Sequence, residues 1–276
     1  MDPAVLHAAF GDAFADYLIG PFQLALEAWP AFLARQAVDL SLSRVAVSAQ
    51  QGLLAFAFVA ARPAARRWRL ATMGARPVAR GSGAAPALLD DFIARARAAG
   101  QQAVELEVFA QNERALRLYQ GRGFVERHEL FGYRLAGSES EGEPAAAAGA
   151  AAQPVARDDA LAWLRATEAR IGELPLQVTA DVLSALAPPW QAWRRGAAQL
   201  VFSAADGGPL VLHSLIDTSP DQADAALLLQ ALRAQYPTRE IRVPQLQRND
   251  LGGRALEAAG FERLPLHQLW LRLDLS

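Results

Sequence analysis

A stretch that is poor in large apolar residues divides the chain near its middle. Gly, Ser, Glu, Pro and Ala dominate residues 137–156, and Val155 is the one large apolar side chain among them. Such a segment cannot bury a face, and it is long for a structureless loop inside one domain. The 276-residue sequence therefore predicts two domains, residues 1–136 and 157–276, joined by a linker over residues 137–156.

The composition favours a folded, cytoplasmic protein. Hydrophobic residues make up 52% of the chain and charged residues 20%, which is enough to build real cores. The longest apolar run, residues 53–61, is far too short to span a bilayer, so we expect a buried strand and no membrane partner. The first residues include neither a basic nor a long apolar segment, so we expect no export signal. A net charge of -2 argues against a broad nucleic-acid-binding face.

The residue types also limit the chemistry. The chain has no cysteine, which excludes disulfides and thiolate zinc sites, and its four histidines are scattered singly. We therefore expect no metal. All 27 basic residues are arginine, and together with the many alanines this is typical of a GC-rich bacterial genome.

The first half predicts a mixed α/β sheet flanked by helices, because its strands and helices alternate without a regular βαβ rhythm. A Gln-Gln-Gly turn joins two of the strands as a hairpin. The expected helices cover residues 5–17, 23–36, 86–99 and 113–120, and the expected strands cover residues 43–49, 53–61, 68–73 and 103–109, followed by a strand pair ending near Leu135.

The two halves align with each other. A shift of 137 residues places Asn112, one of only two asparagines in the chain, on the other one, Asn249. The same shift places Gly123-Phe124 on Gly260-Phe261. Both segments have the order strand, Asn, short helix, Gly-Phe, strand. We interpret this pattern as an internal duplication.

A glycine-rich loop lies between an expected strand and an expected helix. Glycines in Arg80-Gly-Ser-Gly-Ala-Ala85 let successive backbone N–H groups point into one small volume, and the following helix adds its positive end. This arrangement suits a pyrophosphate, with Arg80 as a cation at the rim, although an ordinary turn has the same pattern. A Rossmann loop is excluded because that pattern requires Gly or Ala five residues after its first Gly, and the residue five places after Gly81 is Pro86. A Walker loop is excluded because it requires a lysine, and the chain has none.

This loop and a second motif resemble those of the GCN5-related N-acetyltransferase (GNAT) family. The family's cofactor loop, Arg/Gln-x-x-Gly-x-Gly/Ala, is matched by Arg80, Gly83 and Ala85. Its second signature is matched by Leu106-Glu-Val108, Asn112, Ala115, Leu118-Tyr119 and Gly123-Phe124. The resemblance covers residues 1–136, and with the duplication it implies two tandem GNAT-like domains.

The resemblance implies acetyl-CoA as acetyl donor, bound where two parallel strands, here residues 68–73 and 103–109, splay apart. A substrate amine would attack the thioester directly, without a metal. Asn112 and Tyr119 would contact the cofactor. The other cofactor residues implied are Met73, Gly74 and Ala75 along the pantetheine arm, and Arg80, Gly81, Ser82, Gly83, Ala84 and Ala85 around the pyrophosphate.

Two residues are candidates for proton transfer. Glu107 shares one strand face with Glu105, and its place in the Leu-Glu-Val motif favours it as the base; the alternative is a solvated edge or pairing with arginine. Tyr119 lies about two helical turns after Asn112 and is the candidate acid, although a tyrosine on such a helix also suits a core. Asn112 is expected to cap this helix as well.

The resemblance also implies that the first two helices and the last strands line the acceptor site. The aromatic residues there also suit a core, and the polar ones stand in apolar surroundings. The candidates for acceptor binding are Asp16, Trp29, Asp39, Ser41 and Tyr133.

The second half is predicted to be a degenerate copy. The interval from Gly208 to Asn249 is 19 residues shorter than that from Gly52 to Asn112, and it contains no glycine-rich cradle. Glu107 and Tyr119 align with Pro244 and Leu256. Acidic residues stand where a pyrophosphate would need donors, namely Asp217 and Asp221. We expect this half not to bind acetyl-CoA. Its remaining role could be to close the substrate site, to complete the first domain's sheet or to mediate assembly. A homodimer is compatible with these roles.

The leading hypothesis is thus an N-acetyltransferase that acts on a primary amine of a small molecule or peptide. The alternatives are a catalytically silent acyl-CoA sensor or protein-interaction module, and a scaffold that binds no CoA.

Overall fold

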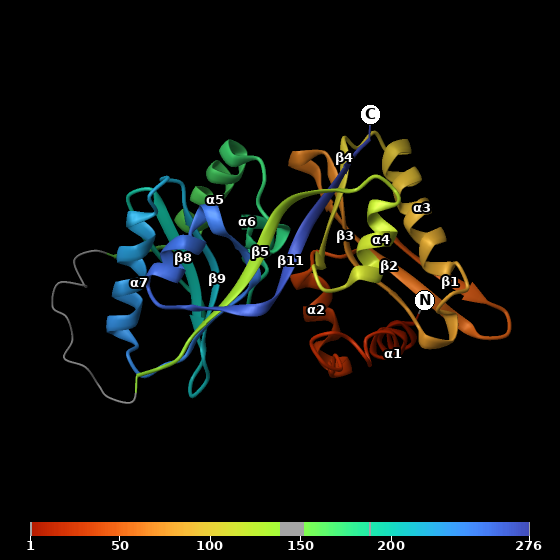
Figure 1. The fold of residues 1–276 in the computed structure, drawn as a ribbon, viewed down its shortest axis with the longest axis horizontal. Coiled ribbons are helices and arrows are strands. Elements are labelled where there is room, and N and C mark those ends of the chain that lie inside the picture. Colours follow the sequence, from red (N-terminus) through yellow and green to blue (C-terminus); the bar gives the residue numbers. More distant parts are fainter. Residues whose placement is uncertain (1, 139–151, 188, 276) are drawn as a thin grey trace. The chain divides into compact units, whose positions relative to one another are not determined.

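The computed structural model describes residues 2–138, 152–187 and 189–275, and it divides the chain into two units (Figure 1). The first unit consists of Met1–Arg127 together with Trp270–Ser276, and the second of His128–Leu269. The predicted domains, residues 1–136 and 157–276, differ from these units in two places. Residues 128–136 are grouped with the second unit, and Trp270–Ser276 are grouped with the first.

The elements of the first unit follow the predicted order. They are α1 (Pro3–Ala13), η1 (Leu26–Ala28), α2 (Trp29–Arg35), β1 (Asp39–Ser48), β2 (Gly52–Arg62), η2 (Pro63–Ala65), β3 (Arg67–Ala75), η3 (Pro77–Ala79), α3 (Ala84–Ala98), β4 (Ala103–Phe109), α4 (Glu113–Gln120) and the start of β5 (Val125–Leu135). Three expectations were wrong. The first helix ends at Ala13 rather than Tyr17, because Phe14 leaves the helical conformation. The helix expected over residues 23–36 is reduced to η1 followed by α2, which begins at Trp29, and the expected strand pair near Leu135 is the single strand β5.

Helices cover both faces of the sheet in the first unit. One face carries Phe56 and Phe58, whose rings pack against Phe10 of α1 and Trp29 of α2. The opposite face carries Trp68, which stacks on Phe92 of α3. The apolar face predicted for α3 is the buried one. This packing places the end of α1 and the start of α3 next to the end of β3.

The neighbouring strands β3 and β4 separate partway along their length. They run parallel and pair from Arg67 with Ala103 to Arg69 with Glu105. Beyond this point β3 continues to Ala75 along β2, with an irregularity in register near Ala71, and its parallel register with β4 ends. Unpaired backbone on two diverging strands leaves room for a ligand that supplies the missing hydrogen bonds. These are the strands for which a splay was predicted.

The second unit repeats this order of elements. After the end of β5 it contains β6 (Gln153–Val155), α5 (Arg157–Ile171), η4 (Leu176–Val178), α6 (Ala180–Ser184), β7 (Gln191–Arg195), β8 (Ala198–Ala204), β9 (Leu210–Asp217), α7 (Ala223–Gln235), β10 (Ile241–Arg248), η5 (Asn249–Leu251), α8 (Gly253–Ala258) and β11 (Glu262–Asp274). Two helices, a three-strand meander, a helix, a strand, a short helix and a last strand occur in both units. The repeat supports the predicted duplication.

The predicted linker is partly structured. Residues 139–151 lie outside the described residues, but β6 (Gln153–Val155) pairs antiparallel with β7, with Val155 opposite Ala192. Val155, the one large apolar residue of the segment, packs against a buried cluster of the second unit. The linker prediction was therefore wrong for its last residues, because a single apolar side chain is enough to anchor a short edge strand.

Each sheet is completed by the strand that ends the other half of the sequence. In the first unit, the end of β11 lies next to β4, and Leu275 donates a backbone hydrogen bond to Gln102 at 2.8 Å. In the second unit, β5 pairs antiparallel with β10, with Tyr133 opposite Val243. Of the three roles left open for the second half, completing the first sheet is thus the one that the strand order shows.

Within the described ranges, none of the helices combines the length and the apolar character needed to cross a membrane.

Candidate active site

A cleft of about 510 Å³ opens in the first unit beside the end of β3. Its walls come from the end of α1 and the following turn, from the end of β3, from the start of α3 and from α4. The lining residues are Ala13, Phe14, Asp16, Tyr17, Met73, Gly74, Ala75, Arg80, Ala85, Pro86, Asn112, Arg114, Ala115, Arg117, Leu118 and Tyr119. Seven of the eleven predicted cofactor residues therefore line one cleft: Met73, Gly74, Ala75, Arg80, Ala85, Asn112 and Tyr119.

Gly74 lets α1 approach the floor of the cleft closely. A Cβ atom on Gly74 would lie 2.7 Å from the ring of Phe56 and 3.0 Å from the Cβ of Ala13. Any larger residue would have to displace these side chains, so glycine is required for packing here.

The glycine loop places free backbone donors at the start of α3. Gly81 and Gly83 have φ angles of +82° and +85°, which favour glycine, and Gly83 is the N-cap of the helix. The Ser82 hydroxyl accepts a hydrogen bond from the backbone N–H of Ala84, at 3.3 Å. The N–H groups of Gly81 and Gly83 have no hydrogen-bond partner among the described residues. Free donors and the positive end of a helix of 15 residues are the features that suit the binding of an anion.

Arg80 spans this loop and the end of α1. Its Nη1 and Nη2 donate to the two carboxylate oxygens of Asp16, at 2.5 and 2.6 Å. These hydrogen bonds hold the pKa of Asp16 below its ordinary value. The predicted cation at the rim is therefore neutralised by a carboxylate of the same cleft.

Two tyrosines, Tyr17 and Tyr119, line the cleft. Burial raises the pKa of the Tyr119 hydroxyl well above its ordinary value, and the nearby Tyr17 raises it further. Burial also raises the pKa of Tyr17, and the side chain of Asn112 near its hydroxyl opposes this shift. Asn112 caps α4 as predicted, because its Oδ1 accepts from Ala115 N at 3.2 Å. The Tyr119 hydroxyl has no hydrogen-bond partner among the described residues and remains protonated, so it can donate to a ligand.

The two strand carboxylates have different surroundings. Both oxygens of the fully buried Glu105 are ion-paired, with Arg62 at 2.5 Å and with Arg67 at 3.3 Å. Glu107 uses Oε2 alone, which accepts from Arg69 at 2.5 and 2.6 Å. Its Oε1 is buried and has no partner among the described residues. Glu105 is thus structural, whereas Glu107 keeps one oxygen free, although it does not line the cleft.

The structure brings only one of the five acceptor-binding candidates, Asp16, into the cleft. Trp29 is 2% exposed and stacks on Phe32 in the core. The carboxylate of Asp39 accepts a hydrogen bond from the hydroxyl of Ser41, at 2.6 Å, on the edge strand β1. Tyr133 is buried in the second unit, where its hydroxyl donates to Glu257. These four residues satisfy their packing or hydrogen bonds locally.

Three cleft residues with polar side chains, Tyr17, Arg114 and Arg117, were not singled out as site residues from the sequence. Tyr17 follows the first helix, and its place in the cleft depends on the early end of α1. Arg114 and Arg117 lie within the Asn112 motif, three residues apart and hence on one side of α4. The helical spacing after the capping asparagine is the signal that could have identified them.

In the second unit, acidic side chains occupy the corresponding helix start. Asp217, fully buried at the end of β9, accepts hydrogen bonds from Ser219 N at 2.8 Å and from Ala225 N at 2.9 Å. Asp221 accepts from Ala223 N at 3.3 Å. The donors that could hold a pyrophosphate at the start of α7 are therefore bound to carboxylates of the chain itself.

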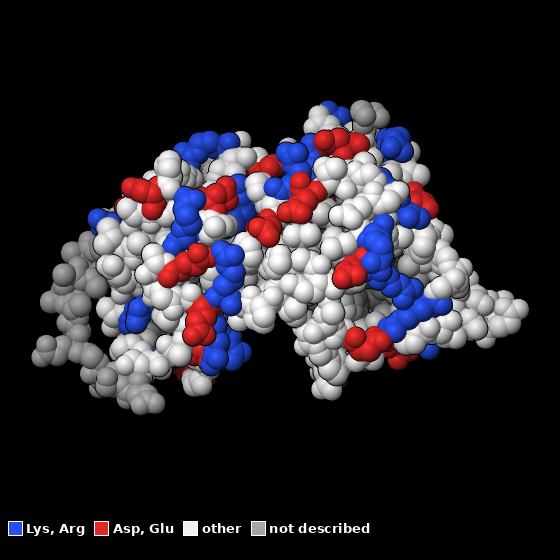
Figure 2. Space-filling model, viewed as in Figure 1, with Lys and Arg blue, Asp and Glu red and all other residues white. Residues whose placement is uncertain are grey.

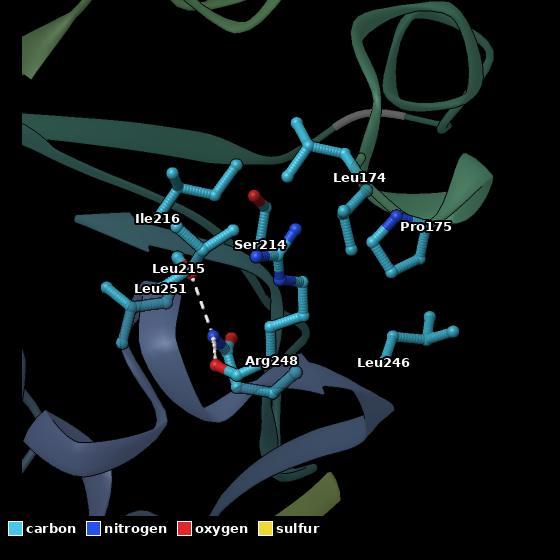
Figure 3. A pocket seen from close by; sticks show the side chains of 10 residues that line it. Leu174, Pro175, Ser214, Leu215, Ile216, Leu246, Arg248 and Leu251 are labelled. Atoms are coloured by element: carbon cyan, nitrogen blue, oxygen red, sulfur yellow. Dashed lines mark hydrogen bonds between the residues drawn. The ribbon is translucent and has the colours of Figure 1, made fainter. Parts of the chain in front are cut away.

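The counterpart of the splayed strands is also filled in the second unit. The parallel register of β9 and β10 covers Leu210 with Ile241 and Val211 with Arg242. Further along, Gln247 Nε2 bridges the strands by donating to Leu215 O at 3.1 Å. Leu174 and Pro175 close the space from the side (Figure 3). The cavity that remains, about 10 Å³, has room for one water molecule at most.

Comparisons with known proteins agree with this geometry. Residues 10–124 match the model of the "Acetyltransferase (GNAT) family". A GCN5-related N-acetyltransferase from Sphaerobacter thermophilus superposes with a TM-score of 0.66 at 15% identity, covering 100% of this chain and 94% of that one. A putative acetyltransferase from Pyrococcus horikoshii gives 0.65 at 15% identity, covering 100% and 88%. A tandem GNAT protein from the clavulanic acid biosynthesis pathway gives 0.58 at 15% identity, covering 99% and 95%. No curated protein matches the sequence significantly.

The family-model match and the structural neighbours support an acyltransferase. Residues 10–124 match the GNAT acetyltransferase family, and the chain has the fold of GNAT proteins, a tandem one among them, over its whole length.

Proposed function

We propose that the first unit transfers the acetyl group of acetyl-CoA directly to a primary amine of a small molecule or peptide. The observation that carries this proposal is the cleft of about 510 Å³, where the end of β3 meets the free donors of the glycine loop. The pantetheine arm would lie along Met73, Gly74 and Ala75, and the pyrophosphate at Gly81 and Gly83.

The proposed reaction needs one base and one acid. The amine nitrogen forms a bond to the acetyl carbon while the carbon–sulfur bond breaks, and the products are an amide and CoA. The proton that leaves the amine would go to the free Oε1 of Glu107. Because Glu107 does not line the cleft, the proton would have to reach it through an intervening water molecule. The sulfur would take a proton from Tyr119, which burial keeps protonated.

We propose further that the second unit binds no acetyl-CoA. The support is twofold: Asp217 and Asp221 occupy the helix start, and Gln247 with Leu174 and Pro175 fills the space between the strands. A pyrophosphate there would meet two carboxylates instead of free N–H groups.

Calorimetric titration of acetyl-CoA into the full chain tests both statements. We expect one site per chain. The same protein is then incubated with acetyl-CoA and a panel of primary amines while release of the CoA thiol is followed. We expect release that depends on the amine.

The outcomes separate the hypotheses. Two sites per chain would show that the second unit binds the cofactor. Binding without thiol release from any amine would favour the silent acyl-CoA sensor over the enzyme. An absence of binding would overturn the cofactor assignment altogether.

Removal of the Asp16 carboxylate should tighten cofactor binding. Arg80 is held by Asp16 in the cleft, so a phosphate must compete for the guanidinium. In Asp16→Asn the arginine is free and the cleft loses a negative charge. We expect the Kd of acetyl-CoA to fall about two- to fivefold, the scale of an exposed ion pair. Titration calorimetry at constant ionic strength measures this change.

Asp12→Asn is the matched control for this variant. Asp12 lies on α1 and pairs with Arg76 at 2.9 Å, but neither residue lines the cleft. We expect no change in Kd for this control. Equal effects of the two substitutions would show that general charge, and not competition for Arg80, controls the affinity.

A further inference from the structure

The cleft has more positive charge than a pyrophosphate at the glycine loop requires. Three arginines, Arg80, Arg114 and Arg117, line it, and Asp16 is the one carboxylate among the lining residues. Figure 2 shows basic side chains gathered in a line beside a hollow in the face of the first unit that is turned to the viewer. Because Arg80 belongs to the loop, the surplus charge comes from α4.

The two α4 arginines are available to a ligand. Arg114 is exposed and forms no ion pair within the described part of the chain. Arg117 pairs with Glu113 at 3.2 Å, but the side chains of both are largely exposed, at 70% and 79%, so water competes with this contact. Neither arginine contributes to a core. Their three-residue spacing directs both toward the same region of the cleft wall.

Acetyl-CoA carries a second anionic group that matches this charge. Besides its pyrophosphate it has a phosphate monoester on the 3′ position of the ribose, which is close to doubly charged at neutral pH. A pair of guanidinium groups binds such a phosphate through several charge-assisted hydrogen bonds. The pyrophosphate would use the donors of the glycine loop, which leaves the α4 arginines for the other phosphate.

We propose that Arg114 and Arg117 bind the 3′-phosphate of the cofactor and make the protein specific for CoA thioesters over their 3′-dephospho forms. This inference rests on the proposed binding of acetyl-CoA in the same cleft. It assigns the α4 arginines to donor selection, apart from the acetyl-transfer chemistry.

The test is a titration of two ligands into the full chain and three variants. The ligands are acetyl-CoA and 3′-dephospho-acetyl-CoA, and the variants are Arg114→Gln, Arg117→Gln and the double substitution. We expect the wild-type protein to bind acetyl-CoA about 10- to 100-fold more tightly than the dephospho form, the effect of one or two charged hydrogen bonds. The double variant should lose this preference, while its Kd for the dephospho form stays unchanged.

Arg97→Gln is the matched control. Arg97 is an exposed arginine near the end of α3 and does not line the cleft, so its loss removes the same charge from the same unit. We expect it to retain the wild-type preference. An unchanged ratio of the two Kd values in the double variant would overturn the assignment of Arg114 and Arg117. A wild-type protein that binds neither ligand would instead refute the proposed function.

Discussion

Tyr119→Phe is expected to lower the rate of acetyl transfer by about 10²- to 10⁴-fold. The substitution removes one hydroxyl from a buried ring that packs against Phe124, so the fold should be kept. The leaving thiolate then lacks its proton donor. The turnover number is measured with the best amine of the panel, and the Kd of acetyl-CoA by calorimetry. We expect the turnover number to fall while the Kd stays within a factor of about two or three.

Tyr17→Phe is the informative partner of this variant. Tyr17 is the other phenol that lines the cleft, and its hydroxyl lies near the side chain of Asn112. We expect Tyr17→Phe to retain most of the activity. A wild-type rate in Tyr119→Phe would remove Tyr119 from the mechanism. A large loss in Tyr17→Phe alone would transfer the role of acid to Tyr17.

Gly83→Glu is expected to abolish measurable binding of acetyl-CoA. Gly83 adopts a φ of +85° at the start of α3, where residues with a side chain are strained. The new carboxylate would also lie at the positive end of the helix and would compete with the pyrophosphate for the same donors. Calorimetry under conditions that saturate the wild-type protein measures the loss. Because open space surrounds the site of the new Cβ, no core side chain has to move.

Gly83→Gln separates charge from strain, because the two side chains have nearly the same size. Gly83→Gln imposes the same backbone strain at the positive φ of this position but adds no negative charge. We expect it to weaken binding clearly less than Gly83→Glu does. Thermal unfolding of both variants shows whether either has lost its fold. If Gly83→Glu binds acetyl-CoA as the wild-type protein does, the glycine loop is not the pyrophosphate site.

Local sequence patterns predicted the elements around the cleft well. The strand β4 and the helix α4 have the predicted bounds, because alternation, an asparagine cap and a closing glycine all act within a few residues. The last strand of each half was harder to place. The partner of β4 is the end of β11, more than 150 residues away in the sequence, and no local pattern encodes such pairing.

The cofactor side of the cleft was predicted better than the acceptor side. A glycine loop and an asparagine motif require particular backbone conformations, so they can be found in one sequence. Acceptor residues depend on packing between distant elements. Trp29 became core because Phe10 and Phe58 surround it, and the Arg80–Asp16 pair joins residues 64 apart. The predicted absence of cofactor binding in the second unit remains a prediction.

The grouping of Trp270–Ser276 with the first unit has a consequence for biosynthesis. The strand next to β4 is translated after the whole of the first half, and Trp270 within it is fully buried. A nascent chain that stops after residue 136 has all the cleft residues but lacks this edge of its sheet. The first half therefore cannot complete its sheet as soon as it has been synthesised. The sheet of the first unit can form in full only after Trp270–Ser276 have also been translated.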